Sequence, residues 1–76
     1  MTRDDIARVA AILAAAYELS DAHGEHHTQT NYRSIARSVY RRDPTKMAER
    51  ENAYRHALRR LRRAERALLE ACREEE

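Results

Sequence analysis

Residues 43–73 read DPTKMAERENAYRHALRRLRRAERALLEACR and contain no glycine and no proline after Pro44. Asp43 and Pro44 are typical of a helix start, because aspartate caps free amides and proline fits the first turn. Two rows of side chains then recur every seven residues: Met47, Tyr54, Leu61 and Leu68, and four positions behind them Glu51, Leu58, Glu65 and Cys72. This alternating spacing predicts one helix over about 44–73, with a stripe suited to pairing with another helix.

The segment before Asp43 predicts a shorter helix over about 31–42. Thr30 and Asn31 both favour a helix start, and an apolar stripe at helical spacing follows, made of Tyr32, Ile35, Ala36, Val39 and Tyr40. The other face carries arginines, at Arg33, Arg37, Arg41 and Arg42. This helix is expected to end before Pro44, because the residue preceding a proline disfavours the helical conformation.

A first helix is predicted over about 3–21. Thr2 and Asp5 have the spacing of a capping box, and apolar residues recur behind them at helical spacing, including Ile6, Val9, Leu13 and Tyr17. Gly24 is the only glycine of the chain and lies where a helix C-cap belongs.

Residues 23–30 are polar and aperiodic, which predicts a loop. Three histidines and a glutamate lie within five positions here, and such side chains can coordinate zinc or nickel. They lack the ordered spacing of a structural metal site, and the adjacent His26 and His27 are poorly placed to share one ion. A solvated loop is therefore the favoured interpretation, and no metal or other cofactor is expected.

These elements predict an all-α fold: a single domain over residues 1–76 with three helices, the last of them long. The apolar content is thin, because 14 of the 32 hydrophobic residues are alanine. A helix over 44–73 is about 45 Å long, so its later half is expected to extend beyond the other helices. An apolar end of that kind predicts a homodimer, with an interface made of Leu61, Leu68, Leu69 and Cys72.

Charge is distributed unevenly along the chain. The net charge is +2, but residues 33–66 carry eleven arginines and Lys46 against four acids, a balance of +8. The segments on either side are each acidic, at −3. A concentrated basic stretch rich in arginine is typical of nucleic-acid binding, since guanidinium groups pair bidentately with phosphate and guanine. The alternative is a solvated helix face with abundant arginine.

The basic stretch also resembles a known kind of domain. Tyr32–Arg37, Asp43–Thr45 and Ala57–Leu61 are similar to the central part of helix-turn-helix and winged-helix DNA-binding domains, over about residues 31–63 and without the wing. The resemblance implies that Ile35, Ala36, Val39, Leu58 and Leu61 support a recognition helix. It also implies a DNA-binding set of Arg33, Arg37, Arg41, Arg42, Lys46, Arg50, Asn52, Arg55, Arg59, Arg62, Arg63 and Arg66.

The leading functional hypothesis is therefore a small dimeric regulator of transcription that binds double-stranded DNA. The alternative is a helical protein-interaction module, such as an inhibitor, adaptor or antitoxin-like protein of a phage or mobile element, that binds no nucleic acid. No enzyme is expected, because no spacing typical of a catalytic site occurs. No apolar run approaches the roughly 20 residues of a membrane span. The single cysteine, Cys72, has no internal disulfide partner, which favours the cytoplasm.

Overall fold

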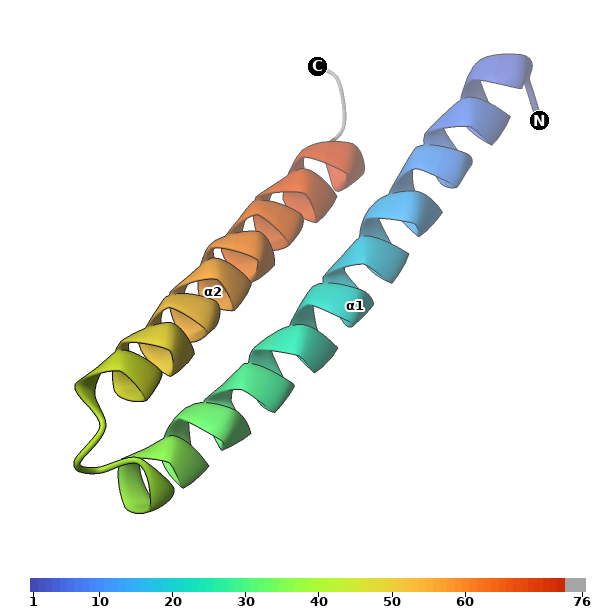
Figure 1. Ribbon diagram of the computed structural model, residues 1–76. Helices are drawn as coiled ribbons and strands as arrows, with labels where there is room; N and C mark the ends of the chain where they lie inside the picture. The colour runs from blue at the N-terminus through green and yellow to red at the C-terminus, as the bar shows by residue number, and fades with distance from the viewer. Residues whose placement is uncertain (74–76) are drawn as a thin grey trace.

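The computed structural model describes residues 1–73, which form an antiparallel hairpin of two long α-helices (Figure 1). α1 spans Arg3–Val39 and α2 spans Pro44–Cys72. The hairpin is slender, with extents of 59 × 18 × 13 Å. The prediction of an all-α chain is confirmed. The prediction of three helices is wrong, because the first two form one continuous helix.

Local sequence signals set the start of both helices. The Thr2 hydroxyl accepts a hydrogen bond from the Asp5 amide at 3.2 Å, and the Asp5 carboxylate accepts one from the Thr2 amide at 3.1 Å. This is the predicted capping box. At the second start, the Asp43 carboxylate accepts a hydrogen bond from the Lys46 amide at 3.1 Å, and Pro44 occupies the first turn. These bonds satisfy amides that have no partner within their own helix.

The helix end at Gly24 and the loop over 23–30 are wrong predictions. α1 continues through both, and Gly24 has no positive φ. A glycine inside a helix costs only about 1 kcal/mol relative to alanine, and no proline accompanies this one. Several polar side chains of the segment are half-buried against α2, among them Glu25, His26 and Gln29. Contacts across the hairpin therefore offset the weak local preference for a helix.

The two helices face each other along a seam with alternating spacings of three and four residues. On α1 the seam comprises Ile12, Ala15, Leu19, Ala22, His26, Gln29, Arg33 and Ala36. On α2 it comprises Met47, Arg50, Tyr54, Ala57, Leu61, Ala64, Leu68 and Ala71. All of these residues are buried or half-buried, as in an antiparallel coiled coil.

The prediction of the α2 stripe is half correct. The row of Met47, Tyr54, Leu61 and Leu68 lies in the seam, but the second row is Arg50, Ala57, Ala64 and Ala71. The row predicted in its place contains Glu65 and Cys72, which are exposed, and Glu51 and Leu58, which border the seam as half-buried residues. Small alanines let the helices approach closely, whereas glutamates there would lose hydration.

Apolar packing is concentrated around the middle of the two helices. Among the described residues, the core cluster consists of Ala22, Leu61 and Ala64, with Leu19 packed against it. Toward the turn the seam becomes polar, with His26, Gln29 and Arg33 in α1. Leu61, 6% exposed, is the only large side chain among the five buried hydrophobic residues of the described part, and the other four are alanines.

The later half of α2 does not extend beyond its neighbour, contrary to prediction. Arg8 near the start of α1 donates a hydrogen bond to the Arg73 carbonyl at 3.3 Å, so the end of α2 lies level with Arg8. It is α1, at 37 residues against 29, that protrudes. The first turn of α1, before Arg8, therefore has no α2 residue beside it.

Candidate nucleic-acid interface

Four arginines share one exposed face of α2, at Arg59, Arg62, Arg63 and Arg66. Arg62, Arg63 and Arg66 follow Arg59 by three, four and seven residues, and this spacing places all four together on the helix surface. They border a shallow concave surface that also includes Glu65 and Leu69. None of the four forms an ion pair with any carboxylate of residues 1–73. We call this group the arginine face of α2.

Arg33 does not join this surface. Its Nε donates to the Glu51 Oε2 at 2.8 Å, and its guanidinium lies over the Tyr54 ring, 4.2 Å from the ring centre. Arg55 contacts the same glutamate at 3.8 Å. Arg33 is thus a seam residue with a satisfied charge, and its assignment to a DNA-binding set is not favoured by its position.

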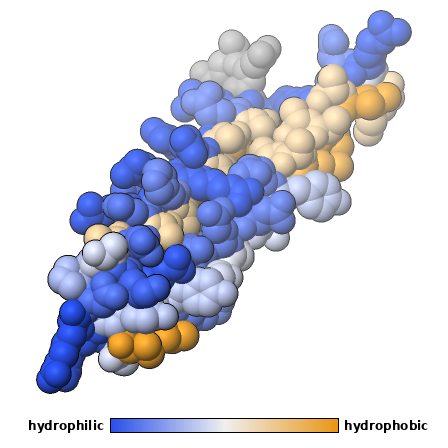
Figure 2. All heavy atoms as spheres, in the orientation of Figure 1, coloured by the Kyte–Doolittle hydropathy of each residue, from blue (hydrophilic) through white to orange (hydrophobic). Residues whose placement is uncertain are grey.

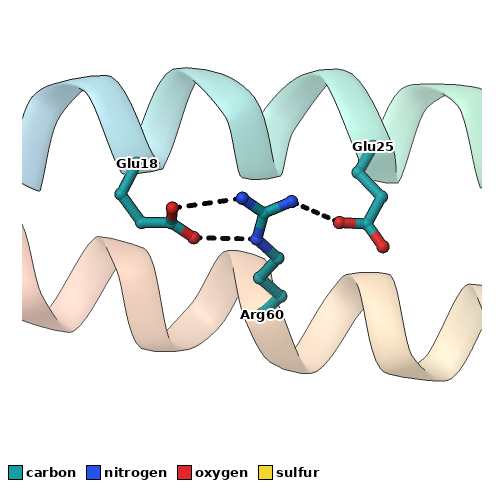
Figure 3. Close-up of polar contacts among 3 residues, drawn as sticks. All are labelled: Glu18, Glu25 and Arg60. Carbon is teal, nitrogen blue, oxygen red and sulfur yellow. Dashed lines mark hydrogen bonds and ion pairs between the residues drawn. The ribbon is translucent and has the colours of Figure 1, made fainter.

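Arg60 lies between two carboxylates of α1, as Figure 3 shows. Its Nε and Nη2 donate to the two oxygens of Glu18 at 2.7 and 3.1 Å, and its Nη1 donates to Glu25. These hydrogen bonds lower the pKa of Glu18 and raise that of Arg60. Arg60 is not a member of the predicted DNA-binding set. Its hydrogen bonds to Glu18 and Glu25 give it a structural role in joining the helices.

The remaining predicted basic residues lie near the turn. Arg37, Arg41 and Arg42 are exposed and form no ion pair within residues 1–73. Lys46 is exposed, with its Nζ 5.3 Å from the centre of the Tyr40 ring. Half-buried Arg50 lies 5.8 Å from the centre of the Tyr32 ring, and Asn52 is exposed on α2. The turn thus carries a second positive region, distinct from the arginine face.

The arrangement differs from the one that the helix-turn-helix resemblance implies. In such domains a short helix supports a recognition helix that crosses it, whereas here α2 lies antiparallel along α1. Two of the supposed supporting residues, Ile35 and Val39, are exposed instead of packing beneath α2. Any contact with DNA must therefore use the outer surface of a hairpin.

The histidine segment forms no metal site. Within residues 1–73, no group of three or more histidine, cysteine, aspartate or glutamate side chains is placed to hold an ion. His26 points into the seam, its ring centre 5.6 Å from that of Tyr54, while His27 on the outside forms a hydrogen bond with Asn31 at 3.3 Å. The helical conformation separates the side chains that the sequence places side by side.

The predicted dimer residues fall into two groups. Leu61 is buried against α1, and Leu68 is half-buried in the seam, so both are engaged within the chain. Leu69 and Cys72 remain exposed. Figure 2 shows apolar surface over the N-terminal half of α1, with hydrophilic surface over most of α2. The two helices thus present surfaces of different character.

Comparison of the chain with protein-family models, curated proteins and solved structures gave no match. In the described part of the chain, neither helix has an apolar stretch long enough to span a membrane. The surface of the hairpin is therefore the basis for any functional proposal.

Proposed function

We propose that this chain is a small DNA-binding regulatory protein that acts as a homodimer and contacts DNA through the arginine face of α2. The observation that carries the proposal is the set of four exposed arginines without an ion pair in residues 1–73. Guanidinium groups bind phosphate oxygens in pairs of parallel hydrogen bonds. A row of them on one helix therefore suits a phosphate backbone.

The rest of the outer surface of α2 is compatible with this use. Asn52 and Arg55 lie nearer the turn and are suited to adenine and guanine edges. From Asn52 to Arg66 the helix covers about 21 Å. Because α1 covers the opposite side of α2, this surface is open to a major groove about 12 Å wide. The phosphate contacts of the arginine face supply affinity, and contacts to base edges supply sequence preference.

The test is a salt titration of binding to a random-sequence DNA duplex. The wild-type affinity should fall linearly with salt on logarithmic axes, because each neutralised phosphate contributes about 0.9 to the slope. A double Arg62→Ala, Arg66→Ala variant should lower that slope by roughly 2. Arg8→Ala serves as the matched control, since Arg8 is an exposed arginine of α1 on the side toward α2, away from the arginine face. No detectable binding at about 50 mM salt would exclude the proposal.

A second candidate is a protein-interaction module that binds no nucleic acid. It is favoured by a groove near the turn, lined by Tyr32, Ile35, Ala36, Tyr40, Lys46, Glu49 and Arg50. Exposed aromatic and aliphatic side chains beside cations suit an amphipathic partner helix with acidic flanks. Recovery of one stoichiometric protein partner, together with no shift of duplex DNA, would favour this candidate.

A further inference from the structure

We infer that a second copy of this chain packs antiparallel against the N-terminal half of α1, so that the start of each α1 fills an apolar groove of the other copy. The inference deepens the homodimer part of the proposed function and specifies its surface. It does not require that the protein bind DNA.

The first part of this surface is a stripe on α1. Ile6, Val9 and Leu13 are 57%, 46% and 51% exposed. At 100° per residue they fall within a narrow sector of the helix, and Tyr17, 70% exposed, continues the sector one turn later. Four large apolar side chains in one exposed row are unusual on a helix that already buries a different face, and they mark a contact surface.

The second part is a groove at the end of the hairpin where the chain termini lie. It is lined by Leu19, Glu65, Leu68, Leu69 and Cys72, and is mostly apolar. Cys72 lies four residues after the seam residue Leu68, and Val9 lies four residues after position 5, which is one heptad before the seam residue Ile12. In an antiparallel pair these positions lie on the same side. The stripe and the groove therefore adjoin as one apolar face.

The protruding start of α1 is the segment that would occupy this groove in a second copy. Because α2 ends level with Arg8, Ile6 lies beyond the end of α2 and has no partner helix in its own chain. In an antiparallel pair centred between Ala11 and Ile12, Ile6 of one copy lies beside Tyr17 of the other. The protruding turn then reaches the groove of the second copy beside Leu68 and Leu69, and the reverse contact forms by symmetry.

Charge selects the antiparallel orientation. Arg3 and Asp21 are separated by 18 positions, which is five helical turns, so both lie on the same flank of the stripe. In the antiparallel pair, Arg3 of each copy lies close to Asp21 of the other, giving two opposite-charge contacts. A parallel pair would instead put this flank of the two copies on opposite sides of the interface, so neither opposite-charge contact would form.

The interior of the hairpin gives an independent reason for a second copy. Among the described residues, four of the five buried hydrophobic side chains are alanines, which is a small core for a chain of this length. Several larger apolar side chains are exposed instead, among them Ile6, Leu13 and Tyr17. A second copy supplies a complementary surface of the same shape and charge pattern.

Sedimentation equilibrium of the full chain is the first test. The wild type should behave as a dimer, and Leu13→Asp should weaken dimerisation by at least about 100-fold, because two buried carboxylates result. Val39→Asp is the control, since Val39 is equally apolar and 64% exposed but lies outside the stripe. A monomeric wild type would overturn the inference, as would a dimer that dissociates with Val39→Asp and persists with Leu13→Asp. Circular dichroism should show helical chains in both variants.

Charge exchange is the second test. Arg3→Glu and Asp21→Arg should each weaken the dimer by about three- to tenfold, and the double variant should restore it. Arg3→Glu places an acid in the first helical turn, so it does not weaken the helix itself. Failure of the double variant to restore the dimer would overturn the antiparallel arrangement. Salt-titrated DNA binding of the same proteins separates the outcomes, because a dimer without DNA affinity leaves this inference intact and excludes only the DNA proposal.

Discussion

Arg60 of α2 holds both carboxylate oxygens of Glu18 of α1, at 2.7 and 3.1 Å, although the two residues are 42 positions apart in the sequence. Glu25 accepts a third hydrogen bond from the same guanidinium. The contact flanks the core cluster, because Glu18 adjoins Leu19 and Arg60 adjoins Leu61. It therefore adds a directional contact that fixes the register of the two helices beside the core cluster.

Loss of this contact should reduce thermal stability. Arg60→Ala leaves two carboxylates without a partner and should lower the melting temperature by about 3–6 °C. The neighbouring Arg59→Ala, which removes an arginine with no ion pair in residues 1–73, should change it by less than about 1 °C. Thermal melts followed by circular dichroism measure both, and equal losses would contradict the assigned roles.

Acid should lower the thermal stability of the hairpin, and protonation of Glu18 should account for part of that loss. Hydrogen bonds from Arg60 hold the pKa of Glu18 below its ordinary value of 4.5, and hydrogen bonds from the Thr2 amide and side chain lower the pKa of Asp5. Because these pKa values are lower in the folded state, the stabilisation is complete above the ordinary values and is lost as pH falls below them. Melting temperatures should thus decline below about pH 4.5. Glu18→Gln should make that decline shallower, and Glu49→Gln, at an exposed position, should leave it unchanged.

Gly24 should be replaceable with a gain in stability. A Cβ built at this position meets nothing within 4 Å, and the backbone is helical. Gly24→Ala should raise the free energy of unfolding by about 0.5–1 kcal/mol, because alanine loses less conformational entropy on folding. Urea unfolding provides the measurement. A destabilised Gly24→Ala variant would show that α1 is interrupted at this residue.

The burial of His26 should destabilise the hairpin. Its Nε2 and the Oε1 of Gln29 are buried and lack a hydrogen-bond partner among the described residues. His26→Leu should therefore stabilise the hairpin by about 1 kcal/mol, despite the loss of the contact with Tyr54. His23→Leu, at an exposed position of the same helix, should have little effect. Urea unfolding of the two variants side by side would reveal whether burial decides the difference.

Leu61 should be the most sensitive aliphatic position. It is 6% exposed and packs in the cluster with Ala22 and Ala64. Leu61→Ala should cost about 2–4 kcal/mol through lost burial and a residual cavity. Val39→Ala, at a position 64% exposed, should cost less than about 0.5 kcal/mol. Similar losses at both positions would show that the core is not where the structure has it.

Short-range signals in the sequence were sufficient for the two helix starts that occur, but the similar signal at Thr30 and Asn31 predicts a start that α1 does not have. Thr2 with Asp5, and Asp43 with Pro44, act through contacts within three residues, so the residues themselves predict the result. The continuity of α1 was not predictable in this way. Its seam passes through His26, Gln29 and Arg33, which read locally as a polar interruption, and the residues that receive them lie on α2.

The candidate site likewise has features that sequence spacing predicts and features that depend on residues far away in the sequence. The crowding of Arg59, Arg62, Arg63 and Arg66 on one face follows from helical spacing alone. Which arginines are neutralised does not, because the partner of Arg33 is 18 positions away and that of Arg60 is 42 positions away. Sequence spacing therefore predicts a cationic surface but not its composition.

The unequal halves of the seam determine where the hairpin opens. Alanine and leucine join the helices around Ala22 and Leu61, whereas histidine, glutamine and arginine line the α1 side of the seam between Ala22 and Ala36. Transient separation should therefore occur more readily in this polar stretch, with amide protons around Gln29 and Arg50 exchanging with solvent sooner than those around Ala22 and Leu61. The stretch that opens most readily thus lies between the core cluster and the covalent link of the two helices.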